Sequence, residues 1–280
     1  MRSEAVLAGI AVGGAHPVRL MAAINVSPES FYVGSVQRDD GALRAAAQRA
    51  AAEGADLIDV GARSTAPYRA TDVPLAEEVR RMTRAVEVVA AAVAVPISAD
   101  TTRAAVAAAA LAAGARIIND VSGLRADPAM ADIAAQGEGA VLMAAPDGGP
   151  VDSPLAEIRR LLSDSLARAA RAGMGPGEIV LDPGIGFFLS ADGSALESSC
   201  AVIAGLATLT DLGCPILVGI SRKAFIGHLT NAAAASDRLS GSLAAAAIAV
   251  YNGAAVVRTH DVAATRDAVR VAEALRRRTC

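Results

Sequence analysis

Ile179-Val-Leu-Asp182-Pro-Gly184-Ile-Gly186-Phe187 is a short apolar run that ends on a carboxylate and then turns on proline and two glycines. Such a run predicts a buried strand that emerges from the core at Asp182, because an unpaired charge is too costly inside it. A carboxylate offers two acceptor oxygens in one plane, so Asp182 at a pocket mouth suits a flat heterocycle with adjacent N–H donors. On this stretch alone, Asp182 is interpreted equally well as the cap of the turn that follows.

Short apolar runs of the same kind recur along the whole chain, at 20–25, 56–61, 96–100, 116–120, 140–143, 178–182, 214–219 and 255–260. Alanine-rich segments separate them, and several end in a glycine directly before the next run, namely Gly54, Gly114, Gly173, Gly213 and Gly253. Glycine at this place closes a helix and turns the chain into a strand. Eight strand–helix units predict an α/β fold, a closed (β/α)8 TIM barrel formed by residues 1–280 as one domain. A doubly wound open sheet is the structural alternative.

The composition agrees with such a barrel and excludes some partners. Hydrophobic residues make up 53% of the 280 residues and aromatic residues only 2%, so the core is expected to consist of small aliphatic side chains. The formal net charge of -3 argues against nucleic acid as a partner, because that would require a basic face. No apolar stretch is long enough to span a membrane.

The N-terminal segment and the cysteines complete this outline. Gly13-Gly14 lies between two apolar pieces of residues 1–19, which predicts a hairpin, with its turn at these glycines, that caps the bottom of the barrel. The three cysteines, Cys200, Cys214 and Cys280, are far apart and specify neither a disulfide framework nor a zinc site. We therefore expect a cytoplasmic protein.

Polar residues gather at the C-terminal ends of the predicted strands. In chain order they are Asn25, Asp59, Asp100, Asn119, Asp120, Asp182, Ser221, Arg222, Lys223, Arg258, His260 and Asp261. Because these ends converge on one mouth of a barrel, the pattern favours a functional interpretation of Asp182 over a simple cap. The acids and amides can bind a polar ring, while the cations and hydroxyls suit a phosphate, so the expected substrate carries both.

Other cofactor motifs are weak in this sequence. Gly184-Ile-Gly186 lacks the third glycine of a dinucleotide fingerprint, and the three histidines are widely separated. A Mg²⁺ ion carried in by a diphosphate needs only one or two protein oxygens, and Asn25 is the expected metal ligand.

Seven motifs, in order and over nearly the whole chain, resemble the dihydropteroate synthase family of pterin-binding enzymes. They are Asn25-Val-Ser-Pro-Glu-Ser-Phe31, Asp59-Val-Gly-Ala-Arg-Ser-Thr65, Ser98-Ala-Asp100-Thr101, Ile117-Ile-Asn119-Asp-Val-Ser-Gly123, Leu181-Asp-Pro-Gly-Ile-Gly-Phe187, Gly219-Ile-Ser-Arg-Lys223 and Arg258-Thr-His260-Asp-Val262. The resemblance implies a transferase of folate biosynthesis. Such an enzyme joins 6-hydroxymethyl-7,8-dihydropterin diphosphate to 4-aminobenzoate or a related aniline and releases pyrophosphate in the presence of Mg²⁺. It also implies a homodimer.

The resemblance also implies roles for individual residues. Asp100, Asn119, Met143, Asp182 and Lys223 would bind the pterin. Asn25, Thr65, Arg258 and His260 would bind the diphosphate, and Phe31, Pro67 and Ser221 would contact the acceptor. The expected catalytic residues are Lys223, Arg258 and His260, of which Arg258 and His260 would stabilise charge on the leaving group.

The chain departs from the family at a few positions. Ala62-Arg63-Ser64-Thr65-Ala66-Pro67-Tyr68 stands where the family has Gly-Glu-Ser-Thr-Arg-Pro-Gly, Phe188-Leu189 replaces Gly-Lys, and Met143-Ala144-Ala145 replaces Met-His-Met. We expect these changes to lie on loops of the acceptor side. They predict an acceptor other than plain 4-aminobenzoate, for instance a ribosylated aniline. The alternatives are a barrel that binds pterin without condensing it and a methyltransferase that delivers a methyl group from a pterin to a corrinoid protein.

Overall fold

The structure is a computed structural model, and it describes residues 3–27, 39–64, 73–146, 148–191 and 193–277. Eight parallel strands form one sheet, in the order β11 (Leu217–Gly219), β12 (Val256–Thr259), β3 (Arg19–Asn25), β4 (Leu57–Gly61), β5 (Ile97–Asp100), β6 (Ile117–Asp120), β7 (Ala140–Met143) and β9 (Ile179–Asp182). The two ends of this order meet at a bridge between Leu181 and Ile216. The sheet therefore closes into the predicted (β/α)8 barrel.

The strand positions follow the sequence prediction closely. Each strand lies within the predicted range except β3, which begins one residue earlier, at Arg19. The largest difference is in β11, which begins at Leu217 rather than at residue 214. Pro215 has no N–H group to donate, so residue 215 can pair only through its carbonyl, which accepts from Leu181 N at 2.9 Å.

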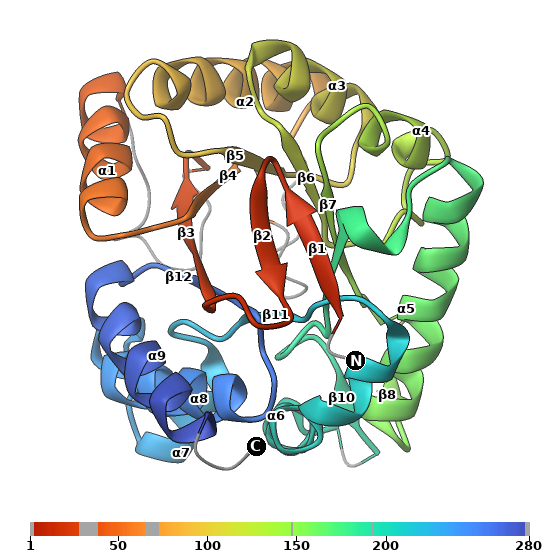
Figure 1. The fold of residues 1–280 in the computed structure, drawn as a ribbon, viewed down its shortest axis with the longest axis vertical. Coiled ribbons are helices and arrows are strands. Elements are labelled where there is room, and N and C mark those ends of the chain that lie inside the picture. The colour runs from red at the N-terminus through yellow and green to blue at the C-terminus, as the bar shows by residue number, and fades with distance from the viewer. Residues whose placement is uncertain (1–2, 28–38, 65–72, 147, 192, 278–280) are drawn as a thin grey trace.

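Helices surround the barrel (Figure 1). They are α1 (Asp40–Ala52), α2 (Leu75–Ala90), α3 (Ala104–Ala113), α4 (Met130–Ala134), α5 (Pro154–Arg171), α6 (Ala195–Ala204), α7 (Ala224–Thr230), α8 (Leu239–Tyr251) and α9 (Val262–Arg276). Two short strands, β8 (Pro150–Val151) and β10 (Leu189–Ser190), pair outside the barrel. The five glycines predicted to precede strands all adopt positive φ, for example +115° at Gly114, as a left-handed helix end requires.

Within the described ranges, no single helix has both the length and the apolar composition needed to cross a membrane. Helix α6 and the 3-10 segment Leu206–Leu212 have this length and composition only when taken together, and the two are bent by 66° at their junction.

The barrel is filled from below by an N-terminal hairpin, as predicted. Strands β1 (Glu4–Leu7) and β2 (Ile10–Gly13) lie across one end of the ring of strands (Figure 1). Leu7 and Val12 of the hairpin are fully buried, and they belong to one cluster with the inward-facing residues Met21, Leu57, Ile117, Val141, Val180 and Leu217. The core at this end of the barrel is therefore built mainly from aliphatic side chains.

The predicted position of the hairpin turn, at Gly13-Gly14, is wrong. Leu7 pairs with Ile10, so the turn residues are Ala8 and Gly9, with φ of 49° and 83°. Positive φ at both positions matches the twist of the two strands, which favours a two-residue turn here. Gly13 instead ends β2, where a Cβ atom would lie 2.3 Å from the Ser3 carbonyl oxygen.

The buried face of the hairpin should carry its contribution to stability. Leu7→Ala removes a side chain that is 0% exposed and should lower the free energy of unfolding by about 2 to 5 kcal/mol. Val6→Ala is the matched control, because Val6 is next to Leu7 and 51% exposed, and it should cost less than about 0.5 kcal/mol. Urea unfolding followed by circular dichroism measures both. Equal costs would show that the hairpin does not close the barrel.

Candidate active site

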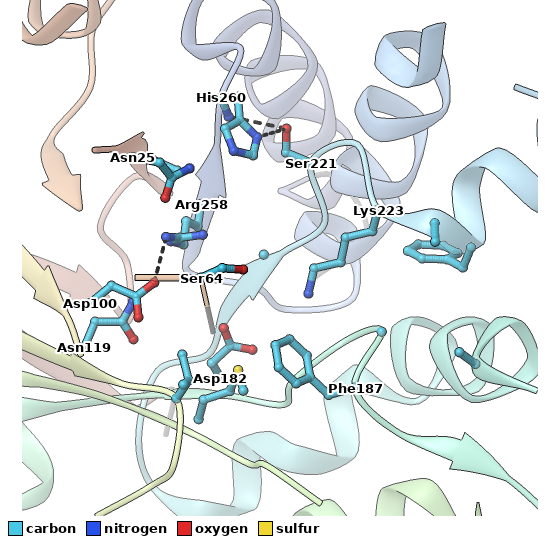
Figure 2. Close-up of a pocket in the computed structure, with 18 of the residues that line it drawn as sticks. Asn25, Ser64, Asp100, Asn119, Asp182, Phe187, Ser221, Lys223, Arg258 and His260 are labelled. Carbon is cyan, nitrogen blue, oxygen red and sulfur yellow. Dashed lines mark hydrogen bonds and ion pairs between the residues drawn. The ribbon is translucent and has the colours of Figure 1, made fainter. Parts of the chain in front are cut away.

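A cavity of about 400 Å³ opens at the C-terminal mouth of the barrel (Figure 2). Of the predicted site residues, the structure places nine in its wall: Asn25, Asp100, Asn119, Met143, Asp182, Ser221, Lys223, Arg258 and His260. Phe31, Thr65 and Pro67 lie outside the described residues. Side chains that are up to 235 positions apart in the sequence, Asn25 and His260, therefore line one pocket.

Strand register explains why these residues are neighbours. Asn25 pairs with Gly61, Gly61 with Asp100, and Asp100 with Asn119. The same holds for Met143 with Asp182, so equivalent strand ends reach the same level. Gly61 keeps this level open, because a Cβ atom there would lie 3.0 Å from Asn25 Oδ1.

An arginine bridges two carboxylates beneath the cavity. Arg258 Nε donates to Asp59 Oδ2 at 2.7 Å, and Arg258 Nη2 donates to Asp100 Oδ2 at 3.1 Å. Asn119 Nδ2 also donates to Asp59 Oδ2, at 3.1 Å. Figure 2 shows the guanidinium of Arg258 directed at Asp100. One cation thus joins β12, β4 and β5.

The bridge with Arg258 uses only one oxygen of each of the two carboxylates. Among the described residues, Asp59 Oδ1 and Asp100 Oδ1 are buried without a hydrogen-bond partner. Burial, and then the charge of Asp59, raise the pKa of Asp100 to about 7, although Arg258 and Arg63 act in the opposite direction. Asp100 therefore has a free oxygen and a proton affinity suited to a ligand that donates hydrogen bonds.

Asp182 both caps a turn and faces the cavity, so the two interpretations of this residue are compatible. Its Oδ1 accepts from Gly184 N at 2.8 Å, while the side chain is 8% exposed and lines the pocket. Burial raises the pKa of Asp182, and the charge of Lys223 and the Gly184 N–H oppose this effect.

Lys223 crosses the cavity toward Asp182 and Phe187 (Figure 2). Its ammonium donates to the Ile185 carbonyl and lies 4.9 Å from the centre of the Phe187 ring. Burial lowers the pKa of Lys223 to about 8, while the charge of Asp182 acts in the opposite direction. At neutral pH this lysine is still mostly charged.

His260 is a half-buried, neutral imidazole in the cavity wall. Its Nδ1 lies 3.0 Å from Ser221 Oγ, and its backbone N–H donates to the same hydroxyl at 3.3 Å. Burial, and then the charge of Arg258, lower the pKa of His260 to about 3, although Asp261 opposes the shift. Its role at neutral pH is therefore that of a hydrogen-bonding group rather than of a cation.

Besides Asp59, three of the polar strand-end residues lie outside the cavity wall and have structural roles. Asp120 accepts from Ser122 N at 2.7 Å and from Leu124 N at 2.8 Å, and so holds the turn after β6. Arg222 is ion-paired with Asp261 at 2.7 Å and donates to two backbone carbonyls. The sequence does not separate these from Ser221 and Lys223, because all of them follow strand ends.

The prediction that the positions that differ from the family lie on the acceptor side of the pocket is partly wrong. Phe188 and Ala144 are each 1% exposed and belong to the core, since their apolar side chains pack beneath the loops. Leu189 and Arg63 do line the cavity. Arg63 is a pocket residue that the assignment of roles from the resemblance missed, and its only signal in the sequence was the departure itself.

The barrel and the pocket define the class of this protein. A family profile described as pterin binding enzyme matches residues 21–260, which include every strand of the barrel except the first two residues of β3. The matched residues contain all nine predicted site residues that line the cavity.

Individual relatives narrow this class. Dihydropteroate synthase of Escherichia coli K12 is 36% identical over 274 residues, which covers 95% of this chain and 94% of the relative. The structure of Xanthomonas albilineans dihydropteroate synthase with 4-aminobenzoic acid superposes with a TM-score of 0.87 at 39% identity, covering 98% of both chains. The structure of the same enzyme in complex with 7,8-dihydropteroate gives a TM-score of 0.83 at 37% identity, covering 97% of this chain and 98% of the other. The chain belongs to the dihydropteroate synthase family and is a transferase.

The neutral state of His260 predicts a pH dependence. The pKa of His260 is about 3 in the folded chain and about 6.5 when unfolded, so between these values the unfolded chain binds the extra proton. The free energy of unfolding should therefore fall as the pH drops below about 6.5, and less steeply in His260→Gln. Imidazole NMR should show no protonation of His260 from pH 8 to 5.

The exposed His228 provides the control, since His228→Gln removes a histidine that does not line the cavity. A His260 ring that titrates with a midpoint near pH 6.5 would contradict the neutral assignment.

Proposed function

We propose that this chain condenses 6-hydroxymethyl-7,8-dihydropterin diphosphate with an aromatic amine and releases pyrophosphate, a step of folate biosynthesis. The observation that carries the proposal is that one cavity contains both kinds of group that this substrate needs. Asp100, Asn119 and Asp182 lie near its floor, and the basic residues Lys223, Arg258 and His260 lie beside them. The dihydropteroate complex of the related Xanthomonas albilineans enzyme supports it.

In this proposal the carboxylate of Asp182 binds the 2-amino group and N3–H of the pterin. Its Oδ1 already accepts from Gly184, which fixes the carboxylate plane before the ligand arrives. Asn119 and the free oxygen of Asp100 bind the remaining polar edge, and Met143 packs against the ring. These groups are rigid because they stand at strand ends.

The leaving diphosphate would be stabilised by the groups on the other side of the cavity. When its C–O bond breaks, the electron pair goes to the diphosphate oxygen, and the pterin ring stabilises the cation left on the methylene carbon. The guanidinium of Arg258 opposes the growing negative charge. The proposal uses the tautomer in which His260 Nδ1 accepts from Ser221 and the proton is on Nε2, which can donate to a phosphate oxygen.

The described residues fit a Mg²⁺ ion that arrives with the diphosphate. They contain no cluster of three or more His, Cys, Asp or Glu side chains able to hold a metal alone. Asn25 Oδ1 borders the space left open by Gly61 and would supply one protein oxygen. Mg²⁺ often uses that few protein ligands and takes the rest from phosphate and water. When bound, the ion would neutralise charge on the leaving group.

We propose 4-aminobenzoate as the acceptor. Ser221 and Lys223 can bind its carboxylate, and Phe187 offers an aromatic face beside them. The amine attacks the methylene carbon, a C–N bond forms, and the nitrogen loses a proton. The case for an acceptor without a carboxylate weakens in the structure, because Phe188 and Ala144 lie in the core rather than in the pocket wall.

The assembly and location are proposals of the same kind. Ile248, Tyr251, Val271 and Leu275 on α8 and α9 are 46 to 62% exposed, and we propose a homodimer through this apolar face. Sedimentation at assay concentrations that finds only monomer would exclude it. A reducing cytoplasm is proposed from the scattered cysteines, and Cys200 and Cys214 are free thiols in the structure.

The proposed reaction is tested by following pyrophosphate. The full chain should release it only when the dihydropterin diphosphate, 4-aminobenzoate and Mg²⁺ are all present, with dihydropteroate as the product by mass spectrometry. Aniline, which lacks the carboxylate, should react with a higher KM than 4-aminobenzoate because it loses the contact with Ser221 and Lys223.

Two results would overturn the proposal. Pterin binding without pyrophosphate release would make the chain a binding barrel, and methyl transfer from a methylated pterin would make it a methyltransferase. Equal KM values for aniline and 4-aminobenzoate would exclude the acceptor assignment alone.

Asp182→Asn tests the pterin site directly. The amide presents an N–H group to a ligand edge that itself donates, so pterin affinity should fall by about 2 to 5 kcal/mol in calorimetry. Asp120→Asn is the matched control, because Asp120 is also a buried strand-end carboxylate but lies outside the cavity wall. If Asp182→Asn binds pterin normally and Asp120→Asn does not, the pterin site is not at Asp182.

A further inference from the structure

Arg63 brings a cation to the cavity wall that the proposed reaction has not yet used. It stands two residues beyond Gly61, the end of β4, and β4 lies between the strands that carry Asn25 and Asp100. Its side chain is 16% exposed and lines the cavity. Arg63 is therefore at the rim beside the oxygens of Asn25 and Asp100.

A buried acid on α2 fixes the orientation of Arg63. Glu78 is 1% exposed, and its Oε2 accepts from Arg63 Nε at 3.0 Å. Arg63 Nη2 donates to Thr102 Oγ1 at 2.8 Å. With two of its nitrogens held in this way, the guanidinium loses little further freedom when an anion binds.

Two arginines are ion-paired with the single carboxylate of Glu78. Arg103 Nη1 also lies 3.0 Å from Glu78 Oε2, and Thr101 Oγ1 donates to Oε1 at 3.1 Å. Arg103 does not line the cavity, and it donates to the Val73 carbonyl as well. One arginine suffices to balance one carboxylate, so the group contains a surplus positive charge, and Arg63 is the member in the pocket wall.

The third nitrogen of Arg63 remains for a ligand. Nη1 has no hydrogen-bond partner among the described residues, where Nε and Nη2 account for the bonds of this side chain. The charge of Arg63 already acts within the cavity, since it lowers the pKa of Asp100 against the effect of burial. By contrast, the charge of Arg258 is compensated by two carboxylates, Asp59 and Asp100.

We propose that Arg63 is a substrate-binding residue that holds the diphosphate of the dihydropterin substrate through its Nη1 edge. This inference rests on the proposed function. A diphosphate carries more negative charge than the compensated Arg258 can balance, and a fixed guanidinium is well suited to phosphate oxygens.

The test compares two arginines that share Glu78. Calorimetry of the full chain with inorganic pyrophosphate and Mg²⁺ should show about 10- to 100-fold weaker binding in Arg63→Gln, because one charge-assisted hydrogen bond is lost. Arg103→Gln removes a cation from the same carboxylate outside the cavity, and its affinity should change less than about 3-fold. In turnover, Arg63→Gln should raise the KM for the dihydropterin diphosphate and leave that for 4-aminobenzoate unchanged.

Each other result decides against the inference. Equal losses of pyrophosphate affinity in both variants, with lowered melting temperatures, would make Arg63 only a structural partner of Glu78. A higher KM for 4-aminobenzoate alone would assign Arg63 to the acceptor carboxylate. If Arg63→Gln does not fold, Arg63→Lys keeps the charge without the planar fork and should bind pyrophosphate with intermediate affinity. A wild-type chain that neither binds pyrophosphate nor forms dihydropteroate overturns the proposed function itself, before any variant is compared.

Discussion

Two carboxylates buried at the mouth of a barrel need a cation between them, and Arg258 is that cation. Asp59 is completely buried and Asp100 nearly so, and the guanidinium of Arg258 donates to both. Without it, two like charges would face each other in a medium that solvates them poorly. The bridge also ties β12 to β4 and β5, so the same contact that makes the acids tolerable fixes the floor of the pocket.

The rest of the site is arranged around this bridge. Because Arg258 occupies one oxygen of Asp100, the other oxygen is left for a ligand that donates hydrogen bonds. Burial, and then the positive charge of Arg258, lower the pKa of His260 and keep it neutral despite its polar surroundings. Below the bridge the hairpin and the inward-facing aliphatic side chains form an apolar cluster, and such low-dielectric surroundings strengthen the charge interactions above them.

The sequence predicted the barrel and most of the pocket because both depend on local patterns. Apolar runs ending in polar residues mark strands and their C-terminal ends, and in a barrel those ends must converge. Asp182, Asn119 and Lys223 follow from this rule. The roles of Asp120 and Arg222 do not, since hydrogen bonds to nearby turns decide whether a strand-end side chain faces the cavity.

Long-range charge pairing is what the sequence could not reveal. Arg258 is 199 residues from Asp59 and 158 from Asp100, and no spacing rule connects them. The pairing of Arg63 with Glu78 is closer in sequence, yet it links a strand end to a helix on the outer layer. The hairpin turn was misplaced for a different reason, because Ala8 takes a positive φ that alanine seldom adopts.

The central claim is that Arg258 stabilises the mouth by compensating Asp59 and Asp100, and a double-mutant cycle tests it most directly. The free energies of unfolding of Asp59→Asn, Arg258→Met and the double variant give the coupling between the two side chains. We expect Arg258→Met alone to cost about 3 to 5 kcal/mol, and the double variant to be at least about 2 kcal/mol more stable than the sum of the single changes predicts. Single changes that add to within about 0.5 kcal/mol would show that the bridge is not what holds the site together.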